Sequence, residues 1–191
     1  STRRHFDVLH RQYAAGERTV RRCIYLTAYS RTLCPEREGE FIEAARAECA
    51  TVADRYQVLL SRAQWYARQG LLMDAKEAFG AATHMRPDLP DAWILGAECW
   101  VQAEDWMLAA TWLEKGLACG PGHVESQISP RLQLVRYPAL RAEAYRKIAE
   151  LHVRLGNHGD ARAYLERAAT ILANLKESKV IGEEKREAKC L

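Results

Sequence analysis

The 191-residue sequence lacks the features that identify several large classes of protein. Its longest apolar runs are far too short to cross a bilayer, and no signal-peptide pattern precedes the first expected helix. Basic and acidic residues nearly balance, at 28 against 25, and are interspersed along the chain. Nucleic-acid-binding domains are usually strongly basic on one face, which this balance does not indicate. We therefore expect neither a membrane span nor a nucleic-acid partner.

The cysteines show no functional pattern. The six cysteines include no CxxC pair and no Cys/His spacing typical of a metal site. Cys23, Cys49, Cys99 and Cys119 fall within expected helices, where a thiol packs as a small apolar group. We predict free thiols and a reducing, cytoplasmic compartment. The first residues, Ser-Thr-Arg-Arg, are not preceded by Met, which a fragment of a longer chain or a trimmed start would both explain.

No arrangement of side chains predicts chemistry within this chain. None of the six histidines pairs at i, i+4 with a second strong ligand. Cys34 and Cys190 are expected in a loop and in the tail, but no His/Asp arrangement near either one supports nucleophilic catalysis. We expect no catalytic residue, no metal and no cofactor, and interpret the histidines as core or surface residues.

The sequence does contain an internal repeat of 34 residues. Shifting the stretch 56–121 by this period aligns large, small, aromatic and helix-breaking positions. The aligned pairs are Leu59 with Trp93, Ala63 with Ala97, Tyr66 with Trp100, Ala75 with Ala109, Phe79 with Leu113, Ala82 with Gly116 and Pro87 with Pro121. Each unit is an antiparallel helix pair that must stack on a neighbour to bury its apolar face. We predict an all-α helical solenoid of such pairs, coiled as a right-handed superhelix.

The repeat divides the chain into five parts. We predict an N-terminal helix and a degenerate helix pair over 1–54, two regular repeats over 55–121, an inserted segment over 122–141, a third repeat over 142–175 and a charged cap or frayed tail over 176–191. The insertion follows from the period, because Ala161 lies 18 residues further from Ala109 than the repeat allows. The expected helices are about 4–14, 19–33, 41–53, 55–69, 71–84, 89–103 and 105–118, with Gly182 as a breaker near the end.

The three units Tyr56–Pro87, Pro90–Pro121 and Ala142–Leu172 resemble tetratricopeptide repeats over about two-thirds of the chain. A weaker resemblance covers nearly all of it. The order of a lead helix, a degenerate pair, two regular repeats and an insertion is similar to the repeat region that follows the catalytic domain in some bacterial and phage family-2 glycosyltransferases. It rests on Phe6–Ala15, on Arg22-Cys-Ile-Tyr-Leu26 and on Arg136-Tyr137-Pro138-Ala-Leu140. No Asp-x-Asp motif or parallel-sheet pattern is present, so this resemblance implies the non-catalytic part of such an enzyme.

Arrays of this kind usually bind through a concave face lined by the first helix of each repeat. By alignment, the lining residues are Gln57, Leu60, Gln64 and Arg68, then Asp91, Ile94, Glu98 and Gln102, then Arg146, Glu150 and Arg154. One interpretation is a groove for an extended or helical peptide. The other is a solvated face, or one covered by the inserted segment. Families that clamp a terminal carboxylate place Lys and Asn where this chain has Leu60 and Gln64, which argues against that specificity.

Two functional hypotheses follow. The first is a repeat region attached to a glycosyltransferase, which docks an acceptor protein or mediates self-association. The alternative is a free-standing adaptor or chaperone that binds a peptide in the groove. The expected partner is therefore a protein or peptide, a catalytic domain of the same polypeptide, or a second copy of the chain. A basic corner of Arg146, Lys147 and Arg154 favours an acidic ligand.

Overall fold

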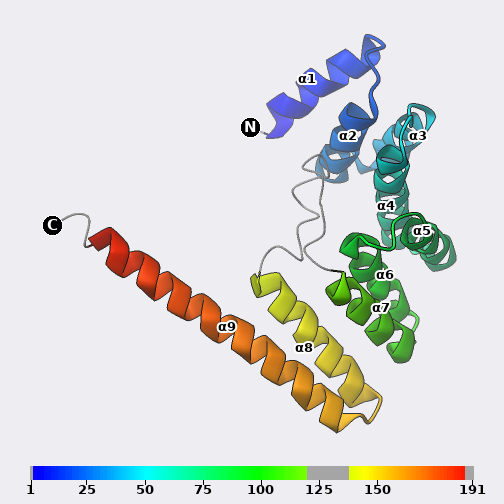
Figure 1. The fold of residues 1–191 in the computed structure, drawn as a ribbon. Helices are drawn as coiled ribbons and strands as arrows, with labels where there is room; N and C mark the ends of the chain where they lie inside the picture. Colours follow the sequence, from blue (N-terminus) through cyan, green and yellow to red (C-terminus); the bar gives the residue numbers. More distant parts are fainter. Residues whose placement is uncertain (1, 120–137, 188–191) are drawn as a thin grey trace. The chain divides into compact units, whose positions relative to one another are not determined.

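The structure is a computed structural model that describes residues 2–119 and 138–187, with side chains over 2–119 and 141–175. Every regular element in these ranges is helical (Figure 1). The chain divides into two compact units, Ser1–Pro87 and Asp88–Leu191. The division falls between the two regular repeats, so the first of them groups with the degenerate pair. Each unit is described by itself below.

The first unit is a lead helix followed by two helix pairs. Its elements are α1 (Thr2–Ala14), α2 (Val20–Leu33), the short 3₁₀ turn η1 (Pro35–Arg37), α3 (Glu38–Ala47), α4 (Val52–Arg68) and α5 (Leu72–Met85). Helix α2 pairs with α3 and α4 with α5, while α1 packs on α2 and α3 on α4. The core between the first helices contains Cys23, Leu26, Phe41 and Ala45, each with none of its surface exposed. The degenerate repeat therefore forms a packed helix pair.

Helix α4 begins three residues earlier than the periodicity predicts, and α3 ends correspondingly early. Thr51 caps α4 by accepting a hydrogen bond from the Asp54 amide at 3.1 Å, while the Asp54 carboxylate accepts one from the Thr51 amide at 3.0 Å. This capping box satisfies two amides that the helix itself leaves without partners. The predicted helix over 41–53 is wrong at its end for this reason, since α3 stops at Ala47.

The second unit contains two helix pairs. Its elements are α6 (Pro90–Gln102), α7 (Trp106–Ala118), α8 (Pro138–Arg154) and α9 (His158–Glu187). Helix α6 pairs with α7 and α8 with α9, and α7 packs on α8. The shared core consists of Ala97, Ala109, Ala110, Leu113, Leu117, Ile148 and Leu151. Beside it, the Trp112 ring lies 5.2 Å from the Trp93 ring and 5.9 Å from the Trp100 ring, measured between centroids.

Small residues occupy the helix crossings, as the repeat pattern predicts. Ala63 and Ala75 in the first unit have none of their surface exposed, and Ala97 and Ala109 in the second have at most 1%. The tightest approach is at Gly116 of α7, where a Cβ atom would lie 2.6 Å from the Ile94 side chain and 3.3 Å from the Pro90 carbonyl. Helix axes separated by about 8–10 Å leave no room for larger side chains at such points.

The helix pair of the third predicted repeat, α8 and α9, is longer at both ends than the repeat requires. Helix α8 starts at Pro138, a residue favoured in the first turn of a helix, so the last part of the predicted insertion belongs to it. The rest of that insertion, 122–137, lies outside the described residues. Helix α9 continues to Glu187 through Gly182, because Lys, Glu and Ala favour helix and one Gly costs only about 1 kcal/mol. None of the described helices has the length and apolar character needed to cross a membrane.

Candidate binding surfaces

The residues predicted to line a groove differ sharply in exposure. Leu60 on α4 and Asp91 on α6 are buried, with 2% and 1% of their surface exposed, so neither offers a ligand much contact area. The others reach the surface: Arg68, Glu98, Gln102, Arg146, Glu150 and Arg154 are exposed, and Gln57, Gln64 and Ile94 are half-buried. The predicted face is thus mainly polar in both units.

In the first unit, Gln64 and Arg68 are tied to the preceding repeat by a buried carboxylate. Glu38, with 3% of its side chain exposed, accepts a hydrogen bond from Arg31 Nε at 3.0 Å and another from Arg68 Nη2. Arg31 Nη2 also donates to Gln64 Oε1 at 2.9 Å. Burial lowers the pKa of Arg68, and the nearby Arg31 charge lowers it further, while Glu38 opposes both. We call Arg31, Glu38, Gln64 and Arg68 the arginine–glutamate network.

The arginine–glutamate network carries one more positive charge than negative. A carboxylate buried alone is strongly unfavourable, and the two guanidinium groups compensate for its lost hydration. Arg31 and Arg68 keep 26% and 39% of their side chains exposed, so N–H donors remain open to solvent. The sequence singled out only Gln64 and Arg68. Arg31 and Glu38 lie in the degenerate pair, and only the packing of α2 and α3 against α4 brings them there.

In the second unit, the corresponding charges pair at the surface. Glu98 on α6 forms an ion pair with Lys147 on α8, and both side chains are more than 40% exposed. Arg154 lies 3.4 Å from Glu150 on the same helix and 4.7 Å above the Trp106 ring. The predicted basic corner is therefore partly neutralised. Among the described residues, Arg146 has no ion-pair partner and keeps its charge available.

Asp91 is a buried carboxyl group without a described partner. It lies in the first turn of α6, and neither carboxylate oxygen accepts a hydrogen bond from another described residue. Burial raises its pKa to about 7, because removal from water disfavours the charged form. The helix N-terminus favours a negative charge there but does not replace the lost hydration. Asp91 therefore keeps its proton to a much higher pH than a solvent-exposed aspartate does.

His152 belongs to a polar cluster that links α7, α8 and α9. Its Nε2 atom lies 3.2 Å from Glu114 Oε1, to which the Tyr164 hydroxyl also donates a hydrogen bond at 2.6 Å. The imidazole stacks on the Tyr164 ring at 5.3 Å, and its Nδ1 lies 4.0 Å from Asp160. Burial raises the pKa of Tyr164 to about 12, and the Glu114 carboxylate adds to the effect. Tyr164 therefore remains a hydrogen-bond donor, and the cluster acts as a link between helices.

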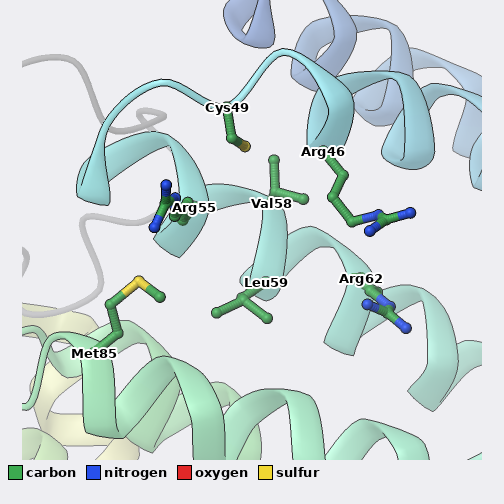
Figure 2. Close-up of a pocket in the computed structure, with 7 residues that line it drawn as sticks. All are labelled: Arg46, Cys49, Arg55, Val58, Leu59, Arg62 and Met85. Atoms are coloured by element: carbon green, nitrogen blue, oxygen red, sulfur yellow. The ribbon is translucent and has the colours of Figure 1, made fainter.

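A pocket of about 350 Å³ opens on the first unit (Figure 2). Arginine side chains come from α3 and α4 and surround apolar side chains of α4 and α5. The lining residues are Arg46, Cys49, Arg55, Val58, Leu59, Arg62 and Met85. We call this the arginine pocket. The sequence did not predict it, because Arg55 and Arg62 look like the solvated side of an amphipathic helix.

No disulfide joins any two of the described cysteines, which are Cys23, Cys34, Cys49, Cys99 and Cys119. Burial raises the pKa of Cys23, Cys34, Cys49 and Cys119, which keeps these sulfurs protonated near neutral pH. Within the arginine pocket, the Cys49 thiol donates to the Ala45 carbonyl at 3.3 Å. We therefore interpret it as a packing residue.

Comparisons with known proteins agree with this architecture. Residues 60–124 match the family model described as Tetratricopeptide repeat. No curated protein matches the sequence. Two solved structures, titled "Crystal structure of MamA" and "Crystal structure of MamA protein", are similar to this chain, with TM-scores of 0.66 and 0.63. Each is 13% identical and covers 90% of this chain, over 89% and 83% of its own length.

At that identity the two structures show the fold alone. None of these descriptions names a glycosyltransferase, so that resemblance stays a prediction. The matched residues cover most of the two regular repeats, one in each unit, and each unit contains one further helix pair. The described part of the chain is therefore an all-α helical-repeat fold, and residues 60–124 within it match the tetratricopeptide-repeat model.

Proposed function

We propose that this chain is a non-catalytic interaction module that binds a protein or peptide segment against the first helices of its repeats. The arginine–glutamate network is the observation that carries this proposal. Arg31 and Arg68 share one buried carboxylate, which holds both guanidinium groups in place before any ligand arrives. A fixed donor loses little side-chain entropy when it binds, so such a pair suits recognition better than two mobile arginines.

The partner's chemistry follows from the surplus charge. Glu38 balances only one of the two arginines, and the exposed donors favour an acidic or amide side chain. In the second unit, the exposed Arg146 offers the same preference. Gln102 adds an exposed polar group on α6 of the second unit. The buried Leu60 and Asp91 lie outside the proposed contact set.

The test compares three variants of the full chain. Arg68→Gln removes the charge from the network and keeps a planar polar group, and Arg146→Glu reverses the available charge in the second unit. Arg162→Glu is the matched control, because this arginine is 83% exposed on α9 and outside the proposed surface. Proteins that co-purify from the source cells are identified, and the one most depleted by the first two variants is purified and titrated.

We expect Arg68→Gln and Arg146→Glu each to weaken binding of the purified partner by about tenfold, and the control to leave it unchanged. Circular dichroism of each variant checks that the fold is retained. Equal binding by all three variants would contradict the proposal. Turnover of a substrate by the isolated chain would contradict its non-catalytic character.

Two settings for such a module remain predictions from the sequence. In one, it is attached to a glycosyltransferase and docks an acceptor protein or a second copy; in the other, it is a free-standing adaptor. The complete reading frame distinguishes them. A glycosyltransferase domain on the same polypeptide would support the first setting, and any other complete reading frame would contradict it.

A further inference from the structure

Helix α4 has a second face that the proposed function does not use. Residues on one side of a helix recur at intervals of three and four, and residues two apart lie about 200° apart around the axis. One set, at intervals of four, three and four, is Arg55, Leu59, Arg62 and Tyr66. The set containing Gln57, Gln64 and Arg68 is displaced from it by two positions, so it lies on the opposite side. The arginine pocket is on the first of these sides.

Two of the three arginine charges in this pocket have no carboxylate partner among the described residues. The Arg55 guanidinium makes no ion pair or hydrogen bond there. Arg62 donates from Nε at 2.9 Å and from Nη2 at 2.8 Å, but its acceptor is the neutral Tyr66 hydroxyl. Only Arg46 is paired, to Glu43 at 2.7 Å, and both of those side chains are more than half exposed. The rim of the pocket therefore carries more positive than negative charge, although Glu43 and Asp74 lie near enough to act on Arg62.

The base of the pocket is apolar. Val58 is 3% exposed, and Leu59 and Met85 are half-buried beside it. Figure 2 shows Leu59 between Arg55 and Arg62, with Met85 approaching from the end of α5. An acidic group at the rim and an aliphatic group at the base would both find partners here. The site thus favours a ligand with a negative charge next to an apolar group.

A smaller pocket of about 130 Å³ adjoins the first and shares Leu59 and Arg62 with it. Its remaining lining includes Tyr66 and two acidic residues of α5, Asp74 and Glu77. The charge along this side of α4 therefore changes from positive to negative over a short distance. An anionic lipid surface or a polyphosphate would meet repulsion at the second pocket, whereas a protein segment can carry both signs.

We propose that the two adjoining pockets bind a protein segment with an acidic side chain, an adjacent apolar side chain and a basic side chain a few residues away. The acidic group pairs with Arg55, the apolar group covers Leu59, and the basic group faces Asp74 and Glu77 in the second pocket. Arg55 and Arg62 are about 10 Å apart along α4. Arg62 lines the second pocket, so that pocket begins about 10 Å from Arg55, which about three residues of an extended chain span at about 3.3 Å each. This inference does not rest on the proposed function, since it uses the opposite side of α4.

The experiment titrates the isotope-labelled full chain with defined peptides and follows backbone amide shifts by NMR. The parent probe is acetyl-Glu-Leu-Ala-Ala-Lys-amide. Two further peptides replace Glu by Gln or Lys by Gln. We expect the parent peptide to shift amides of Arg55, Leu59 and Arg62, and each replacement to weaken binding by about threefold to fivefold, as partly exposed ion pairs do.

A double-mutant cycle assigns the acidic contact. In the Arg55→Gln variant, the parent peptide and its Gln-for-Glu form are expected to bind equally, because the charge that distinguishes them is gone. The control is Arg4→Gln, which removes an exposed arginine of α1 that does not line either pocket and should preserve the difference. Amide spectra also report whether each variant remains folded.

Three outcomes would overturn the inference. The peptides could bind with equal affinity to the unaltered chain, or the Arg55→Gln variant could still distinguish them. The third is that decanoate shifts the same amides while no peptide does, which would assign the arginine pocket to a fatty-acid type of ligand. Failure of the proposed function would leave this result untouched, because Arg31, Arg68 and Arg146 are not varied here.

Discussion

The two units place charges between the first helices of successive repeats, but they do so in different surroundings. In the first unit, Glu38 is almost fully buried between Arg31 and Arg68. In the second, Glu98 and Lys147 pair across α6 and α8 in contact with water. An exposed ion pair contributes little to the free energy of folding, whereas removing one member of a buried pair is strongly destabilising. The same repeat geometry can therefore give either a structural link or a solvated face.

The largest effect that would test this difference between the units is expected at Glu38. Glu38→Gln leaves Arg31 and Arg68 next to each other without a counter-charge. Because both arginines are partly exposed, we expect the free energy of unfolding to fall by about 3 kcal/mol, at the low end for breaking a buried pair. Urea unfolding followed by circular dichroism measures the change. Glu43→Gln is the control, because its ion pair with Arg46 is exposed and should contribute less than about 0.5 kcal/mol. A similar small loss in both variants would mean that burial does not distinguish them.

Asp91 can be compared with Glu38, because it is also buried but has no described counter-charge. Its pKa is raised from 3.8 to about 7, so the folded chain holds a proton that the unfolded chain has released. Stability is therefore highest below about pH 4 for this group and falls as pH rises to about 7. The full shift corresponds to about 4 kcal/mol, and we expect roughly half because the folded chain relaxes around the ionised carboxyl group.

Asp91→Asn should remove this loss, with the variant more stable than the unaltered chain by about 2 kcal/mol at pH 8 and nearly equal to it at pH 4. Urea unfolding at a series of pH values gives both curves. Parallel curves for the two proteins would show that Asp91 ionises normally.

The contact between α6 and α7 in the second unit depends on packing more than on charge. Ala97 is 1% exposed and belongs to the same core cluster as Ala109 and Leu113. We expect Ala97→Leu to lower the free energy of unfolding by about 2 kcal/mol through overpacking. Thermal unfolding is the measurement, and Gln102→Leu on the exposed side of α6 is the control. An unchanged melting temperature for Ala97→Leu would show that the crossing has room.

The smallest effect is expected at the surface pair itself. Lys147→Gln removes the charge facing Glu98, and we predict a loss of no more than about 0.5 kcal/mol at low salt. The loss should disappear at high salt, because the charges are exposed and therefore screened. A loss above about 2 kcal/mol that persists in salt would contradict this prediction, because the pair would then behave energetically like the buried arginine–glutamate network.

The fold was largely predictable, because the 34-residue period follows from the need for small residues where packed helices cross. Small residues such as Ala97 and Gly116 must recur wherever helices cross, whatever the surface residues are. Helix ends were less predictable. The Thr51–Asp54 capping box and the continuation of α9 through Gly182 depend on local balances that periodicity does not measure. The predicted all-α helical-repeat fold is confirmed, while these boundaries differ from expectation.

The binding surfaces were predictable only in part. Repeat alignment assigns a residue to a face by its number, and this does not reveal that Leu60 and Asp91 are buried. It also misses residues that gain a role from distant neighbours. The role of Glu38 depends on its contact with Arg68, which is 30 positions away in the sequence. The arginine pocket likewise needs side chains from α3, α4 and α5. The proposed ligand groove itself stays a prediction.

The tryptophan rings of the second unit provide an optical consequence of the fold. Trp112 lies within 6 Å of Trp93 and Trp100, with ring planes inclined by 70° and 60°. Indole transitions that are this close and steeply inclined couple, which should give paired positive and negative bands in the ultraviolet circular dichroism spectrum. The first unit has a single tryptophan, Trp65, so this signal would come from the second unit alone. Denaturation followed at these bands would thus separate the unfolding of one half of the chain from that of the other.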